Sequence, residues 1–227
     1  MVDELQHVSY AITHDMRAPL RAMSAFSEIL IDKAAGAPPE TQEYCRKIQT
    51  GARRLDKLIQ DALSYTKAVL GELPLEPVDL SKLLQGIVET YPNLHADKAE
   101  IMIEGHLPMV RGNESFLTQC FSNLLGNAVK FVAPGTRPSI RIWADKSAGF
   151  ARICVRDNGV GIPEYAQKRL FGMFQRLDAK HEGTGIGLAI VRKVVERMGG
   201  KVGVDSQVGK GSCFWVELPL APKQVGA

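Results

Sequence analysis

Apolar or small residues recur close to a heptad spacing, mostly three or four positions apart, through the first thirty positions, and this spacing limits the fold more than any other feature. They are Leu5, Val8, Ile12, Pro19, Ala22, Phe26 and Ile29. Such a repeat predicts a long helix that buries one seam against other helices. At about 100° per residue, His14 lies roughly 160° around this helix from Ile12, so its imidazole is expected to face solvent beside Asp15.

Pro19 is an unusual residue for the interior of this helix. It cannot donate a hydrogen bond to the carbonyl of Asp15, and a proline inside a helix costs about 3 kcal/mol or bends the helix. A bend one turn after the exposed His14–Asp15 pair favours a functional site. A solvated histidine on an ordinary helix is the alternative.

A second helical pattern follows a loop at positions 34–39, where Gly36 and two prolines interrupt the first helix. Its apolar face carries Tyr44, Ile48, Ala52, Leu55, Ile59, Ala62 and Leu63. Two amphipathic helices joined by a short loop form an antiparallel hairpin, which we assign to residues 1–67. One hairpin cannot cover both apolar stripes, so we predict a homodimeric four-helix bundle. Packing against the rest of the same chain is the alternative.

The composition excludes several classes of protein. The 227 residues are 45% hydrophobic and 23% charged, which is ordinary for a soluble globular protein of one or two domains. A net charge of +3, without a dense block of lysine and arginine, gives no indication of nucleic-acid binding. No apolar run approaches the ~18 residues that span a bilayer, and no signal peptide opens the chain. We therefore expect a cytoplasmic protein without a membrane span.

The four cysteines, Cys45, Cys120, Cys154 and Cys213, are widely spaced. This spacing favours reduced residues of the core over a metal site or a disulfide framework.

Beyond residue 67 the pattern changes. We predict a linker at 68–78, because glycine and proline are frequent there, and a frayed tail at 222–227. Residues 79–221 mix helical patterns (80–89, 115–131, 185–198) with alternating runs (100–104, 139–144, 151–156, 201–205, 213–218). This mixture predicts an α+β sandwich with helices on one face of a sheet.

The predicted helix 115–131 carries a polar stripe. Gln119, Asn123, Asn127 and Lys130 recur at helical spacing along one face. Asparagine is a poor helix former, so its repetition beside a lysine needs a reason. A carboxamide oxygen suits Mg²⁺, which also holds substrate phosphates, and Lys130 can contact a phosphate directly. A solvated polar face is the alternative.

Two glycine-rich segments follow. The strand at 151–156 leads into Asp157, and Gly159 and Gly161 come next. A carboxylate at a strand end can accept a hydrogen bond from an exocyclic amine such as N6 of adenine, and glycines let a flat ring approach the backbone. The sequence Asp-Asn-Gly at 157–159 is also a common turn signal.

The second segment, residues 183–188, opens a helix, so its backbone N–H groups and the helix dipole suit a phosphate. It has neither the ending of a P-loop nor the spacing of a dinucleotide fingerprint.

Taken in order, these motifs resemble those of the bacterial sensor histidine kinases, and within that family the phytochrome-associated group. The H-box matches residues 14–20, the N-box 123–131, the two glycine boxes 157–161 and 183–188, and the F-box 171–176. The resemblance covers nearly all of residues 5–220. It implies a multidomain protein, with a dimerisation and phosphotransfer hairpin followed by an ATP-binding α/β sandwich of the Bergerat (GHKL) type.

The resemblance also implies roles. His14 would accept the γ-phosphoryl group of ATP, Asp15 would orient the imidazole, and Arg176 would reach the γ-phosphate. Asn127 would ligate Mg²⁺, and residues 172–184 would form a lid over the nucleotide. The nucleotide-binding residues implied in this way are Asn123, Asn127, Lys130, Asp157, Gly159, Gly161, Phe171, Phe174, Gly183, Thr184, Gly185, Gly187 and Leu188.

The implied partners are a second copy of the chain and the receiver domain of a response regulator. The receiver would dock near Pro19–Ser27 and take the phosphoryl group on an aspartate. No sensor or receiver segment is recognisable, so we expect an excised core, or an input domain or protein that supplies the signal from upstream. Ala18 stands where family members often carry threonine or asparagine, which predicts weak phosphatase activity.

Two other functions remain open. One is a dimeric scaffold that binds ATP without catalysis. The other is a GHKL ATPase of the gyrase or MutL type, although those proteins do not place a helical hairpin ahead of the ATP-binding domain.

Overall fold

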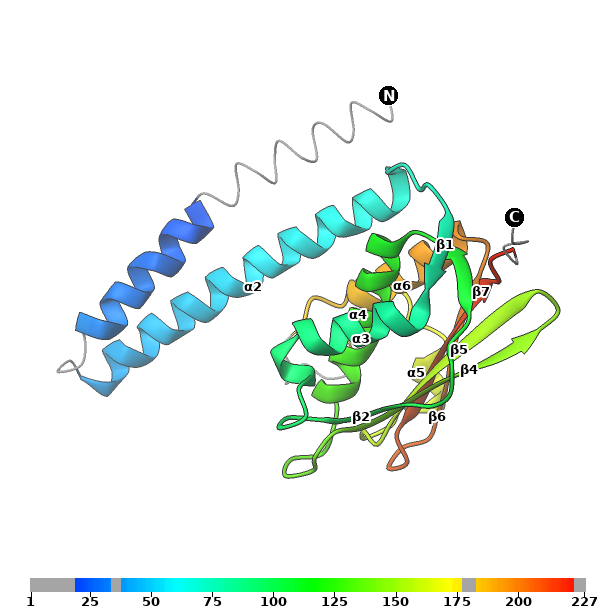
Figure 1. Cartoon of the computed structure of the whole chain (residues 1–227). Coiled ribbons are helices and arrows are strands. Elements are labelled where there is room, and N and C mark those ends of the chain that lie inside the picture. Colours follow the sequence, from blue (N-terminus) through cyan, green and yellow to red (C-terminus); the bar gives the residue numbers. More distant parts are fainter. Residues whose placement is uncertain (1–18, 34–37, 177–182, 223–227) are drawn as a thin grey trace. The chain divides into compact units, whose positions relative to one another are not determined.

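The computed structural model describes residues 19–33, 38–176 and 183–222 (Figure 1). His14, Asp15 and Ala18 lie outside these residues. The chain divides into two compact units, Met1–Gly71 with Asp178–Ile186, and Glu72–Leu177 with Gly187–Ala227.

The elements follow one another as α2 (Pro39–Leu70), β1 (Glu76–Asp79), α3 (Leu80–Thr90), η2 (Pro92–Leu94), β2 (Glu100–Ile103), β3 (Met109–Gly112), α4 (Glu114–Lys130), β4 (Ser139–Ser147), β5 (Phe150–Asp157), α5 (Glu164–Gln167), α6 (Gly187–Arg197), β6 (Lys201–Ser206) and β7 (Ser212–Pro219).

The first unit contains the predicted hairpin. Residues 19–33 form a helix that runs antiparallel to α2 (Figure 1). Arg53 and Gln49 of α2 both donate hydrogen bonds to the carboxylate of Glu28, at 2.9 and 3.3 Å. These bonds tie the two helices together across the loop.

The apolar seam predicted for the hairpin is exposed in a single chain. Its exposed large side chains are Phe26, Ile29, Tyr44, Ile48 and Leu55, and Met23 and Leu30, which were not assigned to the seam, are exposed as well. The residues that α2 buries are Cys45, Ala52, Asp61 and Ala68. An apolar stripe of this length on an exposed helix face is typical of an interaction surface.

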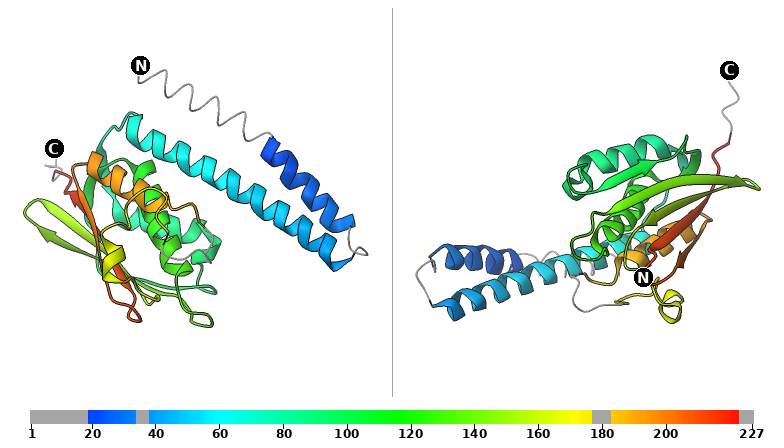
Figure 2. Two further views of the ribbon diagram at one scale, coloured as in Figure 1. Left: turned by 180° about the vertical axis from the view of Figure 1, so that it is seen from behind. Right: turned by 90° about the horizontal axis from the view of Figure 1, so that it is seen from below.

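The second unit is built on a five-stranded sheet in the order β2-β4-β5-β7-β6. β2 pairs parallel with β4, and the other pairs are antiparallel. α4 and α6 pack on one face of this sheet, and α3 packs against α4 (Figure 2). The predicted sandwich of helices on one face of a sheet is therefore confirmed.

Residue alternation along β5 explains where the core lies. Ala151, Ile153 and Val155 are at most 1% exposed on the face toward the helices, whereas Arg152 and Arg156 are exposed on the other face. Opposite them, α3 and α4 bury Leu80, Leu84, Leu117, Phe121, Leu124 and Leu125. The next inward-facing residue of β5 is Asp157, so a carboxylate stands at the edge of an apolar core.

The outer face of the sheet is covered by its own side chains. The guanidinium of Arg152 lies 4.5 Å from the ring centre of Trp215, and that of Arg156 lies 5.3 Å from the ring centre of Trp143. Trp215 lies over Gly203, where a Cβ would overlap its indole. Arginine and tryptophan stacked in this way shield the strands without a further layer of helices.

The two-stranded sheet of β1 and β3 was not predicted. β1 begins at Glu76, inside the stretch predicted as a linker, and α2 continues to Leu70, beyond the predicted end at residue 67. β1 forms because its residues pair with β3, with Val78 opposite Val110. A run of four residues that contains a proline has no sequence pattern that predicts this pairing. The short helices η2 and α5 were not predicted either, and the remaining elements of the second unit differ from their predicted bounds by up to three residues.

All four cysteines are buried and none forms a disulfide. Burial raises the pKa of both Cys120 and Cys154 to about 12. Their thiols therefore stay protonated and unreactive at neutral pH, as expected of core residues.

Candidate functional site

Asp157 is the buried charged residue on which the candidate site centres. It ends β5, is 8% exposed, and its Oδ1 accepts hydrogen bonds from the backbone N–H groups of Gly159 at 2.8 Å and Ser212 at 3.0 Å. In the described part of the chain, Oδ2 accepts no hydrogen bond. Burial raises the pKa of the carboxyl group, and the two N–H donors oppose that rise. One oxygen is thus fixed by the backbone while the other remains able to accept a donor from a ligand.

Three glycines let the surrounding backbone approach Asp157. A Cβ on Gly159 would lie 2.7 Å from Oδ1 of Asp157 and 2.5 Å from the carbonyl oxygen of Phe131, at the end of α4. Gly161 and Gly211 both have positive φ, and a Cβ on either would overlap backbone atoms, those of Gln207 and of Asp157 respectively. The first predicted glycine box therefore serves close backbone packing around the carboxylate.

A network of hydroxyl groups lies beside Asp157 and was missed by the sequence reasoning. Ser206, at the end of β6, lies opposite Ser212, at the start of β7, and their hydroxyl oxygens are 2.9 Å apart. The backbone N–H of Ile162 donates to the Ser206 hydroxyl at 2.8 Å. The only signal in the sequence is a glycine-rich turn flanked by two serines at 206–212, which does not show what those serines contact.

The helix with the asparagine stripe connects the two glycine boxes. At its C-terminal end, the backbone N–H of Val160, in the first box, donates to the carbonyl oxygen of Phe131 at 2.9 Å. About two turns earlier, Oδ1 of Asn123 lies 2.9 Å from the position of a Cβ on Gly187, the first residue of α6. Glycine is required at 187 for this approach, so α4 brings the first box and the start of α6 to one helix.

Asn123 itself is partly used within the helix, since its side-chain amide donates to the carbonyl oxygen of Gln119 at 3.0 Å. Asn127 and Lys130 are half-buried on the same helix, and the ammonium group of Lys130 lies 4.7 Å from the ring centre of Phe131. The described residues hold no cluster of three or more His, Cys, Asp or Glu side chains for a metal ion. A lone carboxamide at Asn127 fits Mg²⁺ only where phosphates and water supply the other ligands.

The residues of the predicted F-box have different surroundings. Phe171 packs edge-to-face on Phe214 of β7, with ring centres 6.4 Å apart. Phe174 is 62% exposed and has a positive φ of 59°, and Arg176 is half-buried. Residues 177–182 of the segment predicted as a lid, 172–184, lie outside the described residues.

The second glycine box divides between the two units. Gly183, Thr184 and Gly185 belong to the first unit, whereas Gly187 and Leu188 belong to the second. Within the first unit, the hydroxyl of Thr184 donates to Oδ2 of Asp61 at 2.5 Å, and Lys57 forms an ion pair with Oδ1 of Asp61 at 2.9 Å. These contacts account for the burial of a carboxylate on α2, which the amphipathic pattern did not predict.

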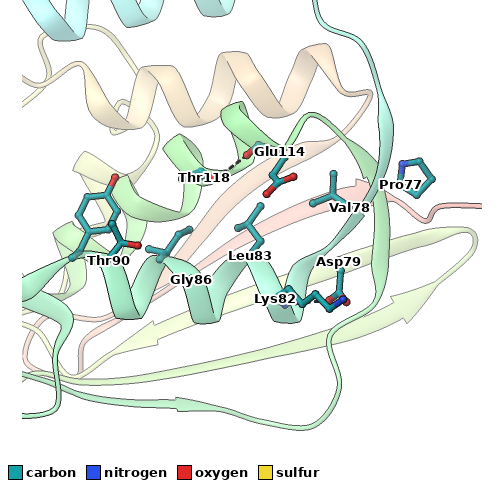
Figure 3. Close-up of a pocket in the computed structure, with 11 residues that line it drawn as sticks. Pro77, Val78, Asp79, Lys82, Leu83, Gly86, Thr90, Glu114 and Thr118 are labelled. Atoms are coloured by element: carbon teal, nitrogen blue, oxygen red, sulfur yellow. Dashed lines mark hydrogen bonds between the residues drawn. The ribbon is translucent and has the colours of Figure 1, made fainter.

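A surface groove of about 430 Å³ lies elsewhere on the second unit. The residues that line it include Val78 of β1, Leu83 and Gly86 of α3, and Glu114 and Thr118 of α4 (Figure 3). None of the residues predicted to bind nucleotide lines this groove. It is therefore distinct from the cluster around Asp157.

Two known protein families match the chain, one in its N-terminal part and one in its C-terminal part. Residues 4–71 match the His Kinase A (phospho-acceptor) domain. Residues 112–222 match the family described as histidine kinase-, DNA gyrase B- and HSP90-like ATPase. No helix of the described residues combines the length and apolar character needed to cross a membrane.

Curated relatives include a phytochrome-like protein and sensor histidine kinases. The chain is 31% identical to phytochrome-like protein Cph1 of Synechocystis over 221 residues, which cover 96% of the chain and 29% of that protein. It is 32% identical to sensor histidine kinase AruS of Pseudomonas aeruginosa, covering 92% of the chain and 22% of AruS. The chain spans less than a third of the length of these relatives.

Solved structures lead to the same family. A crystal structure of full-length ShkA in complex with AMPPNP aligns with a TM-score of 0.72 at 31% identity, covering 95% of this chain and 46% of that one. A mycobacterial sensor histidine kinase, MprB, aligns with a TM-score of 0.57 at 29% identity, covering 65% of this chain and 99% of that one. With a phospho-acceptor domain followed by an ATPase domain of this type, the chain belongs to the sensor histidine kinase family.

Proposed function

We propose that this chain is the catalytic core of a two-component histidine kinase, which phosphorylates His14 from ATP and Mg²⁺ and then phosphorylates an aspartate of a response regulator. The observation that carries the proposal is the buried carboxylate of Asp157, fixed at one oxygen by Gly159 and Ser212. Its other oxygen suits an exocyclic amine, as adenine offers.

The helix α4 supports a site for the phosphates. It contacts the first glycine box at Phe131 and the start of α6 near Asn123. Asn127 and Lys130 lie between those two contacts along the helix. A carboxamide ligand for Mg²⁺ and a cation for phosphate oxygens are then available on one helix, and the N-terminus of α6 adds backbone N–H groups.

The transfer itself assigns roles to His14 and Asp15. A neutral imidazole nitrogen forms the new bond to the γ-phosphorus, the bond from that phosphorus to the bridging oxygen breaks, and ADP leaves. Asp15 orients the ring and stabilises the positive charge that develops on it. At pH 7 roughly three-quarters of a histidine with an unperturbed pKa of about 6.5 is neutral and able to react. The phosphoryl group then passes to a carboxylate oxygen of the receiver domain, which regenerates the imidazole.

The exposed seam of the hairpin supports a homodimer. Phe26 and Ile48, which are 66% and 52% exposed, lie on the two helices of one hairpin. A second hairpin would cover both and complete a four-helix bundle. The receiver domain would dock on the hairpin near Pro19–Ser27, which follows His14 in the sequence.

The direct test is incubation of the chain with γ-labelled ATP and Mg²⁺. The expected product is a protein label that is labile in acid and stable in base, and that is absent from the His14→Gln variant. Binding of a fluorescent ATP analogue should be equal in the two proteins, since His14 is not part of the predicted nucleotide pocket. A label that persists in His14→Gln, or an unlabelled wild type that binds the analogue normally, would contradict the proposal.

A further inference from the structure

We propose that Ser206 is a positioning residue of the base pocket, which acts through Ser212 to select a purine with an exocyclic amine. This inference rests on the proposed function, because it takes Asp157 as the residue that contacts the base. No contact between Ser206 and a nucleotide is required.

The hydroxyl of Ser206 has all of its hydrogen-bonding capacity in use. It donates to the carbonyl oxygen of Gly211 at 3.0 Å and accepts from the backbone N–H of Ile162 at 2.8 Å. Its third contact is the hydroxyl of Ser212 at 2.9 Å. A serine hydroxyl has one proton and two acceptor sites, so these three bonds saturate it.

The direction of the bond between the two serines follows from this count. The carbonyl oxygen of Gly211 can only accept, so the single proton of Ser206 is used there. The Ser212 hydroxyl must therefore donate its own proton to Ser206. The remaining capacity of the Ser212 oxygen is that of an acceptor, in the residue whose backbone N–H holds Asp157.

Gln167 holds the same junction from the other side. Its side-chain amide donates to the carbonyl oxygens of Ile162 and Ser206, both at 2.9 Å. The loop after the first glycine box is thereby clamped to the β6–β7 turn. Any motion of Ser206 would move Ser212, and with it one of the two donors that orient Asp157.

The result is a base pocket whose fixed polar groups are acceptors. Oδ2 of Asp157 and the Ser212 oxygen attract the two protons of an amine and repel a carbonyl oxygen in the same place. Adenine carries an amine at its C6 position, whereas hypoxanthine carries a carbonyl there. Without the Ser206 hydroxyl, Ser212 is free to rotate and to donate, so the carbonyl base is no longer disfavoured.

The experiment measures the affinities of ADP and inosine diphosphate by calorimetry for the full chain and its variants. In the wild type we expect ADP to bind at least tenfold more tightly. Ser206→Ala should lose most of that preference, and Ser206→Thr, which keeps a hydroxyl, should restore it. Ser81→Ala is the matched control, because the Ser81 hydroxyl also bridges backbone groups, accepting from the N–H of Leu107 at 3.1 Å, but lies outside the Asp157 network.

Ser212→Ala provides a second route if Ser206→Ala does not fold. It removes the rotating hydroxyl while the bonds of Ser206 to Ile162 and Gly211 remain, and it should lower the preference for ADP as well. An equal loss of affinity for both nucleotides, or an unchanged preference in either alanine variant, overturns the inference. A wild type that does not distinguish the two nucleotides overturns instead the assignment of Asp157 to the base, and with it the premise taken from the proposed function.

Discussion

Gly211 packs directly against the backbone of Asp157, so closely that a Cβ on Gly211 would overlap the carbonyl oxygen of Asp157. Gly209, two residues earlier in the same turn, has the same φ of 78°. A Cβ on Gly209, however, would meet no atom within 4 Å. The two glycines therefore form a matched pair: a side chain at either position strains the backbone, but only a side chain at Gly211 also overlaps a neighbouring atom.

Substitution of this pair by alanine should give two distinct results. Each variant loses about 1–2 kcal/mol of stability from the left-handed backbone conformation. Only Gly211→Ala must also displace Asp157, so it should melt at a lower temperature than Gly209→Ala and bind ADP at least tenfold more weakly than Gly209→Ala does. Thermal melting and calorimetry test this, and equal ADP affinities in the two variants would show that the contact does not position Asp157.

Asp157→Asn should separate binding from stability. The amide places donors where the carboxylate offers Oδ2 to an amine, so ADP affinity should fall roughly 10- to 100-fold. Burial raises the pKa of Asp157 in the folded state, so the ionised group lowers stability at pH values above its folded pKa and does not do so below its unfolded pKa. Asparagine removes this cost while still accepting from Gly159 and Ser212.

The variant should therefore melt at or above the wild-type temperature at pH 7.5, and this difference should shrink as the pH falls toward 4. Melting curves of the nucleotide-free proteins across that range provide the measurement. A variant that is much less stable at pH 7.5 would mean that the carboxylate supports the fold, contrary to the sign of its pKa shift.

Gly203→Val should open the outer face of the sheet. The new side chain would occupy the space of the Trp215 indole, and Trp215 could no longer stack under Arg152. We expect the free energy of unfolding to fall by about 2 kcal/mol or more. We also expect a red shift of tryptophan emission, because the ring moves into water. Gly149→Val is the control, since no atom lies within 4 Å of its Cβ position, although it also places valine at a positive φ that Gly203 does not have; an equal emission shift in that variant would exclude the stacking explanation.

Charges on the hairpin seam should separate the proposed dimer. Phe26→Asp with Ile48→Glu places two carboxylates on an apolar stripe that a second hairpin would bury, and the unpaired charges would be costly there. Light scattering at micromolar concentration should report a monomer for this variant and a dimer for the wild type. Tyr165→Asp changes a side chain that is 83% exposed on the second unit and should remain dimeric, whereas a wild-type monomer would contradict the proposal.

Periodicity predicted the long elements well because they bury one face each. The helices α2, α3 and α4 and the five strands of the main sheet lie within a few residues of their predicted bounds. β1 and β3 could not be predicted in this way, since each is four residues long and depends on pairing with the other.

Only some residues of the candidate site could be predicted from the sequence. Asp157 and its glycines could be singled out because a carboxylate at a strand end is chemically unusual. The serines could not, because Ser206 and Ser212 acquire their function only when β6 and β7 pair. The burial of Asp61 was equally hidden, since its partner Thr184 lies 123 positions away along the chain. The roles of His14 and Asn127 in catalysis stay predictions.

The last strand of the chain, β7, is an interior strand of the sheet, with β5 on one side and β6 on the other. Until β7 has been synthesised, β6 therefore has no neighbouring strand in the main sheet. Since the backbone N–H of Ser212 donates to Asp157, one of the two donors that fix this carboxylate is missing until β7 emerges from the ribosome. A chain that terminated before β7 would leave this buried carboxylate without that donor, so Asp157 would be held by Gly159 alone.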